Sequence, residues 1–257
     1  MKFFSYGGGV QSNAVMVLQA QGRVNYDEFI FSNVGADSEN PATLEYLERY
    51  ALPYAQEHGI KLTVVENKRT LHQHLVGNNC SIAIPAYLSG GMPGNRSCTV
   101  DFKIRLIARY IRVTYKLYEQ VVGLGISTDE IHRAKIGISK VLGKTIQTNE
   151  YPLIDLRLSR HDCQRIIAEA GLPVPPKSSC WFCPFHRPAY WKEMRMRDPE
   201  TFEKSIALEK RINEKRDAIG RDVVYLHPAL KPLEQAVDEQ TNFFEELANC
   251  ESGYCMV

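Results

Sequence analysis

The stretch Lys2–Ala20 reads KFFSYGGGVQSNAVMVLQA, and it decides the fold class. Residues 2–6 are predicted to form a short strand, and three consecutive glycines, Gly7–Gly9, follow at once. Residues 12–20 are apolar at helical spacing, which predicts a helix. A strand, a glycine turn and a helix in this order are typical of an α/β protein with a parallel sheet.

Outward from this stretch, strands and helices continue to alternate. We expect strands at 29–33 and 60–66 and a helix at 43–58, which completes a β-α-β-α-β order. A helix at 102–117, a strand at 120–126, a short strand or turn at 151–155 and helices at 160–170 and 198–215 follow. Residues 67–97 contain repeated Gly, Asn and Pro clusters and are predicted to be an irregular insertion.

The domain organisation follows from a proline-rich linker at residues 172–176. We expect a nucleotide-binding α/β domain over 1–171. Residues 172–257 then form a small appendage that contains a Cys motif and helices. The fold class is therefore α/β, a Rossmann-like parallel sheet flanked by helices, with a Cys-containing C-terminal appendage.

Composition excludes several classes of protein. The 257 residues are 44% hydrophobic and 24% charged with a formal net charge of +1, so no global field gathers nucleic acid or an anionic membrane. No apolar run approaches the roughly 18 residues that span a bilayer, and the N-terminus does not resemble a signal peptide. Seven cysteines in this length do not suggest a disulfide scaffold, so we expect a cytoplasmic protein without a membrane partner.

The glycine turn is a predicted phosphate site. Glycines allow the backbone to approach a ligand closely, and the following helix presents free N–H groups and its positive dipole end. Ser12 would add a hydroxyl in the first helical turn. The turn lacks both the Gly-Lys-Ser/Thr ending of a Walker loop and Gly-x-Gly-x-x-Gly spacing. The alternative is a glycine-rich turn that binds no ligand.

The segment Ser5-Tyr6-Gly7-Gly8-Gly9-Val10-Gln11-Ser12 resembles the pyrophosphate loop of the adenine nucleotide α-hydrolase superfamily, the PP-loop or N-type ATP pyrophosphatases. It is more closely similar to phosphoadenosine phosphosulfate reductases and their relatives. The superfamily pattern is Ser-Gly-Gly-x-Asp-Ser, so Gly7 replaces the first Ser and Gln11 replaces the Asp.

Four further segments resemble the same family in the same order, and the resemblance covers roughly residues 1–187. These segments are 33–43, 96–103 (RSCTVDFK), 125–133 (GISTDEIHR) and 151–155 (YPLID). The resemblance implies that ATP or a phosphoadenosine nucleotide binds together with Mg²⁺. The implied nucleotide-binding residues are Ser5, Gly7, Gly8, Gly9, Val10, Gln11, Ser12, Asn33, Gly35, Asp37, Gly125, Asp129 and Glu130.

Lys103 and Arg133 are the candidates for binding phosphate or sulfate oxygens during catalysis. Arg suits a bidentate grip on phosphate, whereas Lys acts as a point charge. Asp129 and Glu130 would orient Arg133 or bind Mg²⁺. The alternative is that all four are surface charges at helix ends.

Cys180-Trp181-Phe182-Cys183 is a C-x-x-C motif, whose spacing lets two thiolates reach one metal or cluster. Related thiolating enzymes bind a [4Fe-4S] cluster through cysteines placed like these, which implies Cys98, Cys180 and Cys183 as its ligands. A structural Zn²⁺ with Cys98 and His186, a redox dithiol and two cysteines without a ligand remain as alternatives.

Cys250 and Cys255 lie in the last ten residues. Family reductases keep a catalytic Cys in a C-terminal Glu-Cys-Gly tail, and Cys255 is the corresponding candidate here. The tail of this chain lacks that sequence. A frayed terminus without function is the alternative.

Three functions compete. The first is a PP-loop ATP pyrophosphatase that adenylates a substrate and transfers sulfur with the aid of the cluster. The second is a phosphoadenosine phosphosulfate reductase or sulfotransferase-like enzyme, and the third is a non-catalytic nucleotide-binding subunit of a modification system. The expected partners are a nucleotide and a small-molecule or nucleobase substrate, with tRNA, DNA, a second copy or a partner subunit as further alternatives.

Overall fold

The computed structural model describes residues 1–77, 81–135 and 137–238, which fall into two compact units. Unit 1 comprises Met1–Lys68 and Val100–Ser179. Unit 2 comprises Arg69–Thr99 and the described residues from Cys180 onward. This division differs from the predicted one, 1–171 and 172–257.

Hydrogen bonds explain where the division falls. The Tyr46 hydroxyl donates to the Pro173 carbonyl at 2.8 Å, and the Asn40 N–H donates to the Ser179 carbonyl at 3.1 Å. The proline-rich segment therefore packs on unit 1. The insertion belongs to unit 2 because its strand β4 (Tyr87–Leu88) pairs antiparallel with β8 (Val224–Tyr225).

Unit 1 contains a six-stranded sheet in the order β3-β2-β1-β5-β7-β6. Neighbouring strands are parallel except β6 and β7, which are antiparallel. The predicted α/β class, a mostly parallel Rossmann-like sheet flanked by helices, is confirmed. The strands are β1 (Lys2–Tyr6), β2 (Glu28–Asn33), β3 (Leu62–Glu66), β5 (Glu119–Leu124), β6 (Ile138–Leu142) and β7 (Thr145–Glu150).

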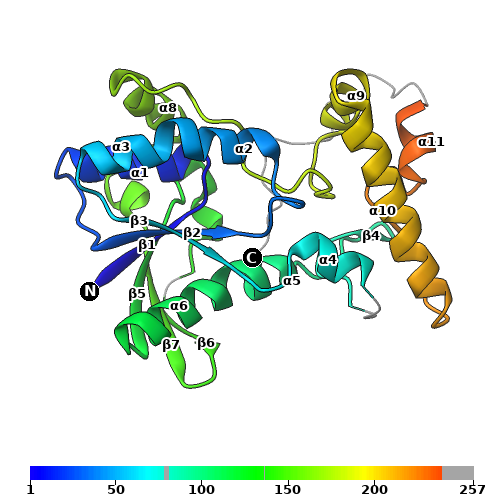
Figure 1. The fold of residues 1–257 in the computed structure, drawn as a ribbon, viewed down its shortest axis with the longest axis horizontal. Helices are drawn as coiled ribbons and strands as arrows, with labels where there is room; N and C mark the ends of the chain where they lie inside the picture. Colours follow the sequence, from blue (N-terminus) through cyan, green and yellow to red (C-terminus); the bar gives the residue numbers. More distant parts are fainter. Residues whose placement is uncertain (78–80, 136, 239–257) are drawn as a thin grey trace. The chain divides into compact units, whose positions relative to one another are not determined.

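Side chains alternate between the two faces of this sheet, as strand geometry requires. Phe4 and Phe31 are fully or almost fully buried with helices α1 (Val10–Ala20) and α8 (Arg160–Glu169) on one face. Phe3 and Ile30 pack on the other face against α6 (Arg105–Tyr115). Figure 1 shows these helices on opposite sides of the strands. Each such buried side chain stabilises the fold by about 1.5–3 kcal/mol.

The remaining helical segments of unit 1 are short. They are α2 (Pro41–Tyr46), the π-helical turn η1 (Leu47–Ala51), α3 (Leu52–Glu57), the π-helical turn η2 (Val100–Ile104), the 3₁₀ segment η3 (Thr128–Arg133) and α7 (Pro152–Asp155). The predicted helix at 43–58 is thus interrupted by a π-helical turn. Residues 152–155, expected as a short strand or turn, form one helical turn with Pro152 at its first position.

Unit 2 is mainly helical. Its helices are α4 (Leu71–Val76), α5 (Ser97–Thr99), α9 (Pro188–Arg197), α10 (Pro199–Asp217) and α11 (Leu233–Asp238). Trp191 and Phe182 are fully buried in its core. Asp198 caps α10 by accepting from the Thr201 N–H at 3.1 Å, with Pro199 at the first helical position. In the part of the chain that the structure describes, no helix has the length and apolar character that crossing a membrane requires.

Candidate functional site

The glycine turn lies at the point where the strand order of the sheet reverses. It follows β1, which has β2 on one side and β5 on the other. In open α/β sheets, ligands bind at the carboxyl ends of the strands at such a switch point. The topology therefore directs attention to Gly7–Gly9 and to the residues after β5.

The three glycines of the turn have different roles. Gly8 has a φ of +74°, and a Cβ on it would lie 3.0 Å from Cγ2 of Thr43. Gly8 is therefore required both by its left-handed backbone and by the close approach of α2. A Cβ on Gly7 would have no neighbour within 4 Å. Gly9 is the N-cap of α1.

The N-terminus of α1 has no side-chain cap, because glycine at the N-cap offers no acceptor. The first intrahelical bond runs from the Asn13 N–H to the Gly9 carbonyl at 3.1 Å. Among the described residues, the N–H groups of Val10, Gln11 and Ser12 have no hydrogen-bond acceptor. Free donors at the positive end of a helix form an anion site.

Two side chains fix this helix start. The Ser12 hydroxyl and the Asn13 amide both donate to the Gly9 carbonyl at 2.9 Å. Tyr6, at the end of β1, donates to the Asn13 side-chain oxygen at 2.7 Å and is almost fully buried. Burial raises the pKa of the Tyr6 hydroxyl above its ordinary value, although its bond to Asn13 opposes this. The Ser12 proton is thus directed at the turn itself.

Gly125 brings the end of β5 close to the turn. A Cβ on Gly125 would lie 3.3 Å from the Ser12 backbone nitrogen and 3.4 Å from the Gln11 carbonyl carbon. Only glycine leaves this approach uncrowded. The structure therefore brings together two predicted segments, the glycine turn and Gly125, that are more than a hundred residues apart in sequence.

Arg133 and the acidic residues of η3 form a second part of the site. Arg133 Nη1 lies 2.6 Å from Glu130 Oε2, and both side chains are about one quarter exposed. The same Glu130 oxygen accepts from Gln11 Nε2 at 3.4 Å. Asp129 accepts from the Ser127 hydroxyl at 3.2 Å and the Arg160 N–H at 2.5 Å. Both carboxylates are therefore already hydrogen-bonded within the protein.

Arg160 was not predicted as a site residue. It begins α8, and its Nη1 donates to Gln11 Oε1 at 3.2 Å. Gln11 therefore donates to a carboxylate and accepts from a guanidinium at the same time. An amide can do both, whereas a carboxylate cannot donate.

The segment after β2 supplies Asn33, Gly35 and Asp37. The Asn33 amide donates to Glu66 at 2.5 Å and its oxygen accepts from the Gly35 N–H at 2.9 Å. Asp37 is exposed and accepts from the Ser38 hydroxyl at 2.9 Å. These bonds hold the chain in a turn at the carboxyl end of β2, with Gly35 at a φ of +117°.

Lys103 lies in η2 and is partly buried. The neighbouring Phe102 carbonyl accepts from the Ser32 hydroxyl of β2 at 2.6 Å, which anchors η2 near the carboxyl end of that strand. Within the described residues, Lys103 has no hydrogen-bond or ion-pair partner. Its charge is therefore available to a ligand.

Cys98, Cys180 and Cys183 all lie in unit 2 and are each partly exposed. Cys180 and Cys183 are joined by a tight turn in which the Cys183 N–H donates to the Cys180 carbonyl at 3.1 Å. Burial raises the pKa values of Tyr87 and Tyr190, and the charges of Glu193 and Asp198 raise that of Tyr190 further. Burial also raises the pKa of the Cys163 thiol, to about 12, as expected of a core cysteine.

The described residues do not complete a metal site. Within residues 1–77, 81–135 and 137–238, no group of three or more His, Cys, Asp or Glu is placed to hold one ion. His186, the expected fourth zinc ligand, uses Nε2 to contact the Cys180 carbonyl at 2.9 Å. The three-cysteine site therefore stays a prediction. Cys80, Cys250 and Cys255 lie outside the described residues.

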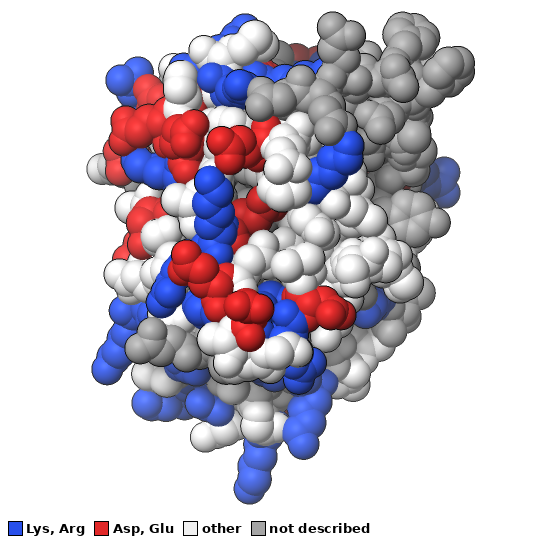
Figure 2. All heavy atoms as spheres, turned by 90° about the vertical axis from the view of Figure 1, so that its right-hand side faces the viewer, with Lys and Arg blue, Asp and Glu red and all other residues white. Residues whose placement is uncertain are grey.

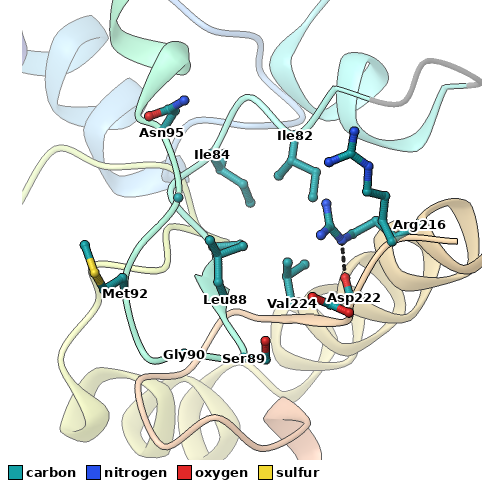
Figure 3. Close-up of a pocket in the computed structure, with 13 residues that line it drawn as sticks. Ile82, Ile84, Leu88, Ser89, Gly90, Met92, Asn95, Arg216, Asp222 and Val224 are labelled. Atoms are coloured by element: carbon teal, nitrogen blue, oxygen red, sulfur yellow. Dashed lines mark hydrogen bonds between the residues drawn. The ribbon is translucent and has the colours of Figure 1, made fainter. Parts of the chain in front are cut away.

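A hollow of about 640 Å³ occurs in unit 2, around β4 and β8. Figure 3 shows the apolar side chains of Ile82 and Val224 near Arg216, whose Nε donates to the Asp222 carbonyl at 2.5 Å, and Met92 on the opposite side of the hollow. None of the predicted site residues lines this hollow.

Surface charge does not gather into one basic area on the face drawn in Figure 2, where Lys and Arg side chains are interspersed with Asp and Glu. Ion pairs along α9 and α10 account for part of this mixing, for example Lys204 with Glu200 at 2.7 Å and Arg197 with Glu193 at 3.1 Å. Exposed pairs of this kind contribute little stability.

Nine chains among the solved structures match this chain. The U34-tRNA thiolase NcsA from Methanococcus maripaludis with its [4Fe-4S] cluster matches with a TM-score of 0.45 and 15% sequence identity, over 82% of this chain and 70% of that chain. No protein-family model and no curated protein matches the sequence. This level of similarity identifies neither a family nor an activity for the chain.

Proposed function

We propose that this chain is a PP-loop ATP pyrophosphatase-type enzyme that binds the phosphates of ATP at the glycine turn and adenylates a substrate. The observation that carries the proposal is the uncapped N-terminus of α1, placed by Gly7–Gly9 at the switch point of the sheet. Three free backbone N–H groups at this position suit the β- and γ-phosphates.

The proposed chemistry is displacement at the α-phosphorus. A substrate oxygen forms a bond to that phosphorus while the bond to the β-phosphate oxygen breaks, and pyrophosphate leaves. The protein stabilises the charge that develops on the leaving group by pre-oriented donors and cations. The α1 N–H groups would do this together with Arg133 and Lys103.

Binding measurements test the phosphate assignment without knowledge of the acceptor substrate. Calorimetric titration of the full chain should show that pyrophosphate competes with ATP and that AMP binds much more weakly than ATP. Equal affinity for AMP and ATP, or no competition by pyrophosphate, would contradict binding of the terminal phosphates at the turn.

Reaction products separate adenylation from other nucleotide chemistry. With ATP labelled at the α-phosphate and candidate acceptors in the form of bulk tRNA, DNA or a metabolite extract, unlabelled pyrophosphate should appear together with labelled adenylated acceptor, or with labelled AMP once the adenylate is displaced. Formation of ADP would exclude this reaction. Tight binding of phosphoadenosine phosphosulfate with no requirement for ATP would instead favour the reductase-like alternative.

Sulfur transfer is the finer part of the proposal. It is supported by the presence of Cys98 and the C-x-x-C pair in one unit, each thiol being partly exposed. A sulfide-level sulfur donor would then form a bond to the acceptor carbon while the bond from that carbon to the adenylated oxygen breaks, and AMP would leave with that oxygen. Anaerobic purification followed by iron, sulfide and zinc analysis distinguishes a [4Fe-4S] cluster from zinc.

A further inference from the structure

Beside the glycine turn, unit 1 contains a buried carboxylate that has no partner. Glu39 is 0% exposed, and neither of its carboxylate oxygens has a hydrogen-bond partner in the described structure. A buried ionised carboxylate without compensation costs several kcal/mol. The position therefore calls for a positively charged or hydrogen-donating ligand.

Two hydroxyl groups on Glu39's own segment and on the segment hydrogen-bonded to it are also unsatisfied. Thr43 is 0% exposed and its Oγ1 has no partner, and the Oγ of Ser179 is buried without one. Thr43 follows Glu39 by four residues, and the intervening Asn40 donates its N–H to the Ser179 carbonyl at 3.1 Å. Three orphaned oxygen-bearing side chains thus come from two neighbouring segments of unit 1.

These segments contact the glycine turn directly. A Cβ on Gly8 would lie 3.0 Å from Thr43 Cγ2 and 3.8 Å from the Ser178 hydroxyl, and a Cβ on Gly9 would lie 3.8 Å from the Ser178 Cβ. The turn carries no carboxylate of its own, because Gln11 stands where the superfamily pattern has Asp. An anionic ligand for a cation that binds with the phosphates therefore has to come from a residue outside the glycine turn.

Other nearby carboxylates are less suitable. Asp129 accepts from Ser127 and from the Arg160 N–H, and Glu130 pairs with Arg133. Glu39 is the buried carboxylate that remains uncompensated. The resulting ligand set of one carboxylate and two hydroxyls consists only of oxygen atoms, which hard divalent cations prefer.

We propose that Glu39, Thr43 and Ser179 bind a divalent cation of the Mg²⁺ or Mn²⁺ type beside the glycine turn. The role of this cation, to accompany the nucleotide phosphates, rests on the proposed function. The site itself rests on the four orphaned oxygen atoms of these three side chains. The positive dipole ends of α1 and α2 oppose a cation in isolation, so its affinity rises when anionic phosphates occupy the turn.

Binding of Mn²⁺ to the full chain, measured by electron paramagnetic resonance without nucleotide, tests the site. Glu39→Gln should lower Mn²⁺ affinity about tenfold or more, because it removes the charged ligand. Glu45→Gln is the matched control, since Glu45 lies six residues further along the chain in α2, is more than half exposed and pairs with Arg49. Equal affinity of wild type and Glu39→Gln, or no bound Mn²⁺ in the wild type, would overturn the assignment.

Thermal unfolding gives a second readout. Mn²⁺ should raise the unfolding temperature of wild type and of Glu45→Gln, but not that of Glu39→Gln. Without a cation, Glu39→Gln should be at least as stable as wild type, because the uncompensated charge is gone. If Glu39→Gln does not fold, Thr43→Val replaces it, and unchanged Mn²⁺ affinity in that variant would overturn the site.

The cation site and the proposed function fail in different ways. Suppose that the wild type binds Mn²⁺ but no ATP, and that Glu39→Gln no longer binds Mn²⁺. This result would support the cation site and refute the nucleotide function. Suppose instead that ATP binds in competition with pyrophosphate, equally tightly with Mg²⁺ and with EDTA, and that Glu39→Gln binds Mn²⁺ as tightly as the wild type. This result would refute the cation site and leave the proposed function unaffected.

Discussion

The guanidinium of Arg133 lies 2.6 Å from the carboxylate of Glu130, and the pair adjoins Gln11 of the glycine turn. The Glu130 carboxylate partly neutralises the positive charge of Arg133, the residue that is proposed to bind phosphate. Glu130→Gln should therefore strengthen pyrophosphate binding, by about twofold to fivefold for a partly exposed pair. Calorimetric titration checks this, with Glu119→Gln on an exposed position of β5 as the control. A weaker affinity would show that Glu130 positions Arg133 rather than neutralising it.

Gly8 and Gly7 form a matched pair for mutation. Gly8→Ala forces a left-handed residue against Thr43 and should cost about 1–2 kcal/mol of stability, with loss of ATP binding. Gly7→Ala has open space within the protein and should leave the stability nearly unchanged. Urea unfolding and ATP titration of the two variants measure the difference. Equal behaviour would refute a specific role for the Gly8 conformation.

Arg160 is expected to add to the positive potential at the turn through its contact with Gln11. Arg160→Gln should lower pyrophosphate affinity by about twofold or more, and the difference from wild type should shrink as salt is added. Arg165→Gln is the control, because Arg165 lies on the same helix with 60% of its side chain exposed. If both variants bind equally well, Arg160 acts only as a structural contact.

The cysteine prediction concerns metal content. Cys180→Ala and Cys183→Ala should abolish any bound iron or zinc, and Cys98→Ala should do so if it is the third ligand. Cys163→Ala should retain the metal, since burial raises the pKa of its thiol to about 12 and keeps it protonated. A wild type purified anaerobically without metal would remove the cluster from the proposed function.

Glu28 predicts a pH dependence of stability. Burial alone would raise the pKa of this fully buried carboxyl, but hydrogen bonds from Thr63, Tyr115 and Tyr110 outweigh it and hold the pKa below its ordinary value. The folded protein therefore binds this proton less readily than the unfolded chain. The stabilisation is present above the unfolded pKa and is lost as the pH falls through the folded one.

Urea unfolding between neutral and acidic pH measures this effect. Glu28→Gln should be less stable at neutral pH, and the difference from wild type should narrow on acidification. Glu48→Gln, at an exposed position of the π-helical turn, should follow the wild type throughout. A constant difference at every pH would mean that packing rather than charge accounts for the effect of Glu28.

The central strands could be predicted because each contains a short apolar run, such as Phe29–Phe31 in β2, and a parallel sheet covered on both faces produces such runs. Strand β6 escaped prediction because Ile138–Leu142 is mostly exposed at the sheet edge and contains polar residues. Strand β7 contains Thr145 and Gln147, which are buried polar residues and carry no hydrophobic signal.

The glycine turn was predictable because it depends on adjacent residues, a strand end and a helix start. Arg160 was not, because its contact with Gln11 spans 149 residues and arises only when α8 packs beside α1. Glu39 gives no sequence signal either, since an acidic residue before a helix is ordinarily read as a solvent-exposed charge. Burial is a tertiary property that a local pattern does not contain.

The chain passes between the two units at residues 68–69, 99–100 and 179–180, which has a consequence during synthesis on the ribosome. A nascent chain that has reached Ser179 carries the whole described part of unit 1, whereas Arg69–Thr99 still lacks the residues with which it packs. Strand β4 gains its partner β8 only about forty residues later. Unit 1 can therefore fold first around an unfinished loop, and a truncation that removes α9–α11 would leave the apolar residues of that loop without a core.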